Sequence, residues 1–324
     1  TPGLHGLTGT LAGDADGLVF RPDPQARPVF DWPKGFGVPH PLRLEGDIAA
    51  WREDGDWRVE TPALRIEGDG YAADVRGGLA FHGNGARPRI DLAAVVDPAQ
   101  VPVAKKFWVR HEMPAAAMDW LNMALVAGTV RDGRAIVSGE LGDWPFGSAD
   151  GHDRRGVFDA RARIEDATIR FQDDWPALER MSGRVRFLND GFSVEDAHGE
   201  LAGVPVRTIE AGMRHYAHSP VEVRATTQAD AGALLTLMRQ SPFHAEHAET
   251  LDNLEVAGPA RVALTLAVPH GAPVRLDGSV ALDGVSARER RFSLDFSDVR
   301  GSARFDQNGF TGERLAARTE GHAG

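Results

Sequence analysis

The sequence of 324 residues contains no cysteine. Disulfide frameworks, thiol nucleophiles and thiolate metal sites are therefore excluded. Basic residues are also scarce, because 36 Lys and Arg stand against 47 Asp and Glu and give a formal net charge of −11. A chain without a basic stretch has little to release counterions from nucleic acid, so nucleic acid is excluded as a partner. The acidic balance also argues against electrostatic adhesion to anionic lipid head groups.

Long apolar runs are missing as well. No stretch approaches the roughly 18 consecutive apolar residues that a membrane-spanning helix requires, and no signal peptide is visible. The first residue is Thr1 rather than Met. We therefore expect a segment of a longer protein, with any membrane anchor outside this sequence.

Motifs that carry chemistry are absent from the sequence. No nucleophile elbow, P-loop or dinucleotide fingerprint occurs, so we predict no enzymatic activity, no metal and no cofactor. His244 and His247 lie among glutamates, but their spacing differs from that of zinc proteases, and a solvated loop is the preferred interpretation. The run GHDRR at residues 151–155 is interpreted as a polar hairpin tip. Three tryptophans beside predicted turns are expected to cover sheet edges rather than to stack on sugars: Trp57, Trp144 and Trp175.

The chain is instead rich in hairpin patterns, of which residues 181–204 give the clearest. Apolar residues alternate with arginines up to Asn189-Asp190-Gly191, a sequence typical of tight turns because these residues tolerate positive φ. The same pattern recurs at residues 299–321 and, more weakly, from Leu7 onward. A repeat of hairpins predicts stacked units rather than a closed globule.

Further strands show period-two alternation at residues 42–50, 261–268 and 274–284, which is typical of a sheet with one apolar and one polar face. Two helical interruptions are predicted. The first covers residues 113–128, with Pro114 in its first turn and Gly128 as its C-terminal cap. Its apolar stripe is expected to lie on a sheet and comprises Met113, Ala117, Trp120, Leu121, Ala124 and Leu125. The second interruption, residues 229–256, begins with a helix near residues 230–240, followed by a loop or short helical turn.

These patterns predict a mostly β fold. We expect an elongated, curved antiparallel β-sheet of repeated hairpins that forms an open hydrophobic groove, with a few short helices. The whole chain is expected to be one repeat segment, divided into strands at 1–112, a helix at 113–128, strands at 129–228, a helical insert at 229–256 and strands at 257–324. Alternation alone leaves open a structural or adhesive β-solenoid with a closed core. A polysaccharide-active enzyme on a β scaffold is a third alternative.

An apolar sheet face that stays open would accept acyl chains, since hydrocarbon gains about 25 cal/mol per Å² on leaving water. The predicted lining of this groove comes from the clearest hairpin and from the two cleanest strands. Its residues are Val185, Phe187, Phe192, Val194, Val262, Leu264, Leu266, Val268, Val274, Leu276, Val280 and Leu282.

Three stretches carry a family resemblance. The first is the hairpin flanked by WPALERMSGRVRF and DAHGELAGVPV. The second is WLNMALVAGTVRDGRAIVSGELGDWPF at residues 120–146, and the third is VAGPARVALTLAVPHGAPVRLDGSVAL at residues 256–282. In order and spacing they resemble the YhdP family of the AsmA-like superfamily over nearly the whole chain.

The resemblance implies a periplasmic segment of a protein anchored in the bacterial inner membrane by an N-terminal helix that this chain lacks. It implies phospholipids as cargo, carried between the inner and outer membranes. Both membranes would then be partners through regions outside this segment, together with unidentified membrane proteins. It supplies no catalytic residues, and the helix near residues 113–127 is expected either to gate or to brace the groove.

Overall fold

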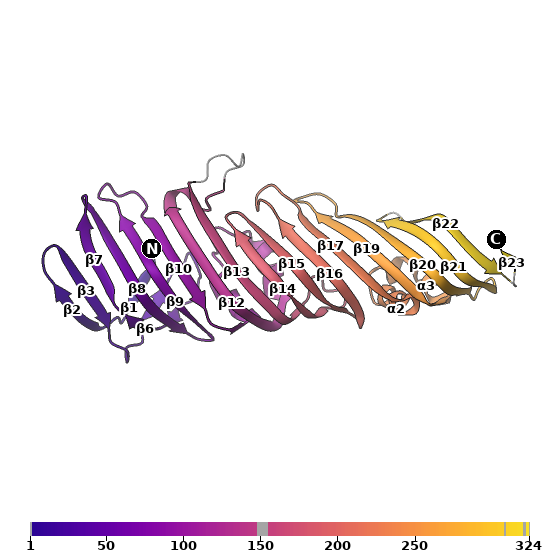
Figure 1. The fold of residues 1–324 in the computed structure, drawn as a ribbon, viewed down its shortest axis with the longest axis horizontal. Helices are drawn as coiled ribbons and strands as arrows, with labels where there is room; N and C mark the ends of the chain where they lie inside the picture. The colour runs from indigo at the N-terminus through magenta and orange to yellow at the C-terminus, as the bar shows by residue number, and fades with distance from the viewer. Residues whose placement is uncertain (1, 148–154, 308, 320–321, 324) are drawn as a thin grey trace. The chain divides into compact units, whose positions relative to one another are not determined.

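The computed structural model describes residues 2–147, 155–307, 309–319 and 322–323. Strands hold 61% of the chain and form a large, open antiparallel sheet with short helices (Figure 1). The mostly β, antiparallel prediction is therefore confirmed. The chain divides into two compact units. Unit 1 consists of Thr1–Glu165 and Val185–Phe192, and unit 2 of Asp166–Arg184 and Ser193–Gly324.

The main sheet of unit 1 is built from antiparallel neighbours that follow the chain order. These are β2 (Gly9–Gly13), β3 (Gly17–Pro22), β7 (Ile48–Glu53), β8 (Asp56–Gly68), β9 (Tyr71–Phe81), β10 (Arg89–Val96) and β12 (Leu125–Glu140). Two short strands pair with its members, β6 (Arg43–Gly46) with β8 and β11 (Ala99–Gln100) with β12. A separate small sheet comprises β1 (Gly3–His5), β4 (Val29–Asp31) and β5 (His40–Pro41).

Register divides the side chains of this sheet into two faces, because successive residues of a strand point to opposite sides. Leu79 lies opposite Val59 on one side and Ile90 on the other. We call this the apolar face of unit 1, and it holds Ala50, Val59, Leu79, Ile90, Leu92 and Val137. The charged face lies on the other side of the same strands and holds Arg58, Glu60, Arg89, Asp91 and Glu140.

Short helices lie in the connections of unit 1. They are η1 (Val101–Phe107), α1 (Ala115–Ala124) and η2 (Leu141–Asp143). The helix predicted at residues 113–128 is shorter than expected, and Gly128 is not its cap but lies within β12 at a φ of 120°. The chain enters the ladder at Leu125 because sheet pairing satisfies its backbone groups, as where Thr129 pairs with Gln100.

Unit 2 contains a second antiparallel series. Three strands contribute residues to both units: β13 (Gly156–Ile169), β14 (Leu178–Leu188) and β15 (Gly191–Leu201). The others are β16 (Val204–Met213), β17 (Val221–Asp230), β18 (Leu254–Ala257), β19 (Pro259–Val268), β20 (Arg275–Glu289), β21 (Leu294–Asp306), β22 (Gly309–Thr319) and β23 (His322–Ala323). The turn predicted at Asn189 is present between β14 and β15, with Asn189 at a φ of 51°.

The helical insert of unit 2 forms α2 (Ala231–Arg239) and α3 (Phe243–Asn253). Asp230 caps α2 by accepting a hydrogen bond from the Gly232 N–H at 2.8 Å. The Arg239 guanidinium joins the two helices by donating to the Leu251 carbonyl oxygen at 2.6 Å. The helix predicted near residues 230–240 is confirmed as α2. The stretch after it, expected to be a loop or a short helical turn, is an 11-residue helix with a distortion at His247.

A membrane-spanning helix and a metal site are two features that would bear directly on function. Within the described ranges, no helix combines the length and the apolarity needed to cross a membrane. The same residues contain no cluster of three or more potential metal ligands, and the imidazole of His244 instead contacts the Asp252 carboxylate at 3.0 Å. Most of the predicted polar tip at 151–155 lies outside the described residues.

Candidate apolar lipid-binding face

Register in unit 2 brings predicted groove residues together in rows that run across the strands. Val262 lies opposite Val280, and Leu266 lies opposite Leu276. On their other side the rows continue into β17, where Val223 pairs with Leu266. Rows of this kind put Cβ atoms of neighbouring strands about 5 Å apart, so the side chains touch and form an unbroken apolar surface. We call it the apolar face of unit 2.

Exposure alternates along β19 from Pro259 to Leu266. Val262, Leu264 and Leu266 are half-buried, whereas Arg261, Ala263 and Thr265 are exposed. Neighbours in the same sheet contribute to this intermediate burial. At the strand ends, two predicted lining residues are more open: Val268 is 39% exposed, and Val274, just before β20, is 47% exposed.

Part of this face is covered by α2. Ala231 of the helix forms a buried cluster with Ala260 and Val285. The predicted lining residues Val280 and Leu282 pack against this cluster. These two side chains therefore face protein on at least one side, whereas Leu264 and Leu266 are not part of the cluster.

The clearest hairpin and its repeat share an aromatic pair beside the turn. The rings of Phe187 and Phe192 lie 6.3 Å apart, and those of Phe305 and Phe310 lie 5.6 Å apart. Phe305 rests on the apolar face of unit 2 beside Gly278, where an added Cβ would lie 2.1 Å from its ring. Val185 and Val194, the other predicted lining residues of the first hairpin, are half-buried.

The apolar face of unit 1 was less evident in the sequence. Leu79 and Leu92 are both half-buried. Gly77, the ladder partner of Leu92, and Gly78 interrupt the apolar pattern of β9. At one end this face is covered by protein. Tyr71 lies there, and its ring is 4.8 Å from that of Phe107 in η1. The ring of His40 in β5 stacks on Phe107 at 5.2 Å.

The accessible surface area supports an open layer in both units. It amounts to 19324 Å² for a chain of 34.9 kDa. Two separate compact domains that share this mass would expose only about 16,000 Å². Part of the exposed surface is apolar, since large hydrophobic side chains such as Ile136 and Val268 are 47% and 39% exposed.

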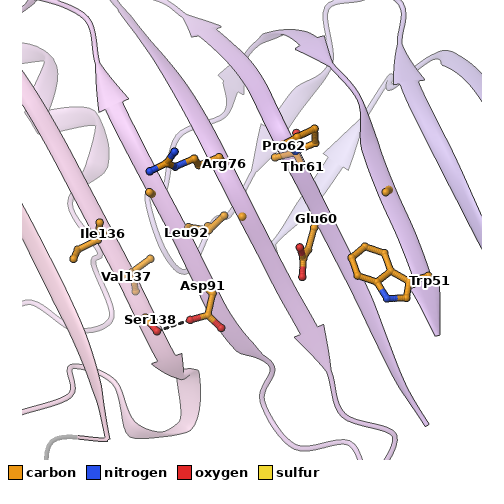
Figure 2. A pocket seen from close by; sticks show the side chains of 13 residues that line it. Trp51, Glu60, Thr61, Pro62, Arg76, Asp91, Leu92, Ile136, Val137 and Ser138 are labelled. Atoms are coloured by element: carbon orange, nitrogen blue, oxygen red, sulfur yellow. Dashed lines mark hydrogen bonds between the residues drawn. The ribbon is translucent and has the colours of Figure 1, made fainter. Parts of the chain in front are cut away.

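A hollow of about 740 Å³ lies on the charged face of unit 1 (Figure 2). Trp51, Ala93 and Ile136 form its apolar part, and Glu60 and Arg76 bring charges to it. The Ser138 hydroxyl donates a hydrogen bond to the Asp91 carboxylate at its margin. The lining surface of the hollow is mostly apolar, although charged side chains stand beside it. We take the apolar faces as the candidate for acyl chains because their apolar rows continue across several strands.

The charged face is organised by cross-strand ion pairs. The nearly buried Asp159 carboxylate accepts hydrogen bonds from Arg186 of the neighbouring strand at 2.8 Å and from Arg161 of its own strand. Arg161 and Arg186 hold the pKa of Asp159 well below its usual range, against the opposing effect of burial. A carboxylate paired twice in this way stays ionised and keeps the face polar.

A second charged cluster joins three strands of unit 1. The His82 imidazole contacts the Glu140 carboxylate at 2.9 Å and the Asp56 carboxylate at 3.0 Å. Hydrogen bonds from the His82 imidazole to the carboxylates of Glu140 and Asp56 raise the pKa of His82 above its ordinary value. The sequence did not indicate this cluster, because the three residues are far apart in the chain and are joined only by strand register.

Comparison with known proteins gives two matches. The family model described as YhdP protein matches residues 1–323. The "Intermembrane phospholipid transporter YhdP" of Escherichia coli (strain K12) is 21% identical over 98% of this chain. The chain spans about a quarter of that relative's length, 25%. No solved structure matches.

Proposed function

Since the chain belongs to the YhdP family, we propose that it is a phospholipid-transfer segment that works between the two membranes of a bacterium. The apolar faces of its units carry the acyl chains, and the head groups remain in water. It acts as a conduit and not as an enzyme. In this proposal it lies in the periplasm, and the membranes and any membrane-protein partners are reached through other regions of the longer protein.

One observation carries the proposal. The rows of half-buried Val and Leu side chains on β17, β19 and β20 align across three strands, and Leu264 and Leu266 lie outside the buried cluster at α2. Water contact with such a surface is unfavourable, and each methylene of an acyl chain that covers it gains about 0.8 kcal/mol. An exposed apolar surface that extends over several strands marks a binding surface.

The same geometry suits movement. Each row offers an acyl chain nearly the same contacts as the next row, because the strands repeat at about 4.8 Å. A chain that slides from one row to the next exchanges equivalent apolar contacts, so no single step requires chemical energy. The direction of net transfer must then come from outside this segment.

The test is to purify the protein and analyse the lipid that it retains. We expect native mass spectrometry to detect bound phospholipid, and we expect the delipidated protein to take up a fluorescent phospholipid from vesicles. The charged-face variant Ala263→Asp serves as a control, since Ala263 is exposed on the side of β19 that faces away from Leu264. Absence of both retained phospholipid and uptake would refute the proposal.

A further inference from the structure

The strand ends on the two sides of the unit 1 sheet are connected differently. Trp57 lies opposite Phe81, and Arg89 lies opposite Glu140, so the turns at 54–55 and 82–88 and the end of β12 share one edge. We call this the tip edge. The connections 23–47 and 97–124 leave from the other edge, which we call the roofed edge.

The roofed edge carries the elements that cover the apolar face. The connections there contain β4, β5, η1 and α1. His40 of β5 is 5% exposed and Val101 of η1 is 4% exposed, so β5 and η1 are closely packed at these residues. A charged head group that crossed there would lose its water, which is costly.

The tip edge instead exposes aromatic rings. Trp57 and Phe81 lie opposite each other on the adjacent strands β8 and β9, and they are 42% and 43% exposed. Phe187 is 40% exposed and lies two residues before the turn residue Asn189, whose backbone N–H donates to the Phe158 carbonyl oxygen of β13. Aromatic side chains at the ends of apolar rows match the boundary between hydrocarbon and water, where such rings are preferred.

A cation accompanies these rings. Arg52 is exposed and lies directly opposite Trp57, in the row of the apolar face that is nearest to the tip edge. In the part of the chain that the structure describes, no carboxylate is paired with its guanidinium. A guanidinium in this position can form charge-assisted hydrogen bonds with a phosphate oxygen.

We propose that phospholipid head groups project from unit 1 along the tip edge. Trp57, Phe81 and Phe187 lie level with the glycerol ester groups, and Arg52 contacts the phosphate as a lipid passes. This inference rests on the proposed function and adds to it the side from which lipids enter and the residues that hold their polar part.

The test uses the intact protein and vesicles of phosphatidylethanolamine and phosphatidylglycerol. One preparation carries a photoactivatable diazirine in the lipid head group, and the other carries it near the end of an acyl chain. Labelled peptides are identified by mass spectrometry. We expect the head-group probe to label peptides that contain Arg52 and Phe81, and the acyl probe to label the strand that contains Leu92.

The outcomes separate the inference from the proposed function. Head-group labelling at the roofed edge, around His40 and Phe107, together with acyl labelling at Leu92 would overturn the inference and leave the proposed function standing. Failure of the acyl probe to label either apolar face would overturn both.

Variants give an independent readout. Trp57→Ser and Phe81→Ser should each slow lipid transfer about fivefold, because each removes one interfacial aromatic contact. The matched control is Trp120→Ser on α1, since Trp120 is 45% exposed but lies in a connection of the roofed edge, and it should transfer at the unaltered rate. Equal slowing by all three variants would count against a special role of the tip edge.

Discussion

Replacement of Leu264 by aspartate tests the open apolar face directly. Leu264 lies between Ala225 and Gly278 in the ladder and is half-buried. If nothing covers it, the new carboxylate stays hydrated, and the free energy of unfolding should fall by only about 1 to 2 kcal/mol, from lost apolar contact and weaker β propensity. Val280→Asp should cost about 4 kcal/mol, because Val280 packs against the cluster beneath α2 and its carboxylate would lose water. Urea denaturation of both variants measures the difference.

The effect on transfer can be bounded from the same geometry. An acyl chain that crosses the new carboxylate must displace its water, and the cost cannot exceed that of protonating the group. With an ordinary aspartate pKa near 3.9, protonation at pH 7 costs about 4 kcal/mol, which corresponds to roughly a thousandfold slower passage. At pH 5 the cost falls to about 1.5 kcal/mol, or roughly tenfold.

The assay is transfer of a fluorescent phospholipid between vesicles at both pH values. Leu264→Asp should transfer lipid up to about a hundredfold faster at pH 5 than at pH 7 and remain at most about tenfold slower than the unaltered protein. The nonionisable Leu264→Asn should show no such recovery, and Ala263→Asp should behave as the unaltered protein. Transfer at the unaltered rate by Leu264→Asp at pH 7, or equal losses of stability in Leu264→Asp and Val280→Asp, would refute the reasoning.

Three further predictions concern the scaffold. Asp159→Asn should lower the free energy of unfolding by about 2 to 3 kcal/mol in urea denaturation at pH 7, since two guanidinium groups lose their shared carboxylate. Because the folded pKa of Asp159 is depressed, this stabilisation is present above about pH 4 and is lost as pH falls through the folded pKa, a loss that the variant should not show. The pKa of His82 is raised, so its stabilising effect is complete below about pH 6.5 and disappears as pH rises through the folded value; His82→Gln should flatten this part of the stability profile, and an unchanged profile would contradict the assignment. Gly278→Val should cost about 2 to 3 kcal/mol, because its Cβ would collide with the ring of Phe305, and Ser279→Val on the charged face should remain close to neutral.

Period-two alternation made most of this fold predictable. In β19 the expected apolar set, Val262 to Val268, lies on one side, and register pairs it with the expected set of β20. The turns at Asp54 and Asn189 were also predictable, because few residues other than Gly, Asn and Asp adopt positive φ at low cost.

The connections were less predictable. The helix η1 was not foreseen, since its run VPVAKKF is short and is held by contacts with β12 and with Tyr71 rather than by helix propensity. The extent of α1 was overestimated because tertiary pairing of β12 overrides helical periodicity beyond Ala124. Trp120, expected on the covered stripe, is 45% exposed.

The candidate site divides in the same way. Alternation identified which residues share the apolar face, but it could not indicate that Ala231 of α2 joins the buried cluster against which Val280 and Leu282 pack, because this contact involves an element far away in sequence. The cluster of Asp56, His82 and Glu140 was hidden for the same reason. Which rows stay open, which are roofed and where charges meet are properties of tertiary register.

A surface that meets no fixed partner has unusual freedom to vary. In a close-packed interior each side chain must fit its neighbours, and one methylene too many or too few is costly. If acyl chains cover Leu264 and Leu266 as proposed, these residues face no such constraint on their outer side, and any aliphatic residue of similar size would serve equally well. Drift among Val, Ile, Leu and Met should therefore be fast on these rows and slow at Gly278 or Asp159, where shape and charge are matched.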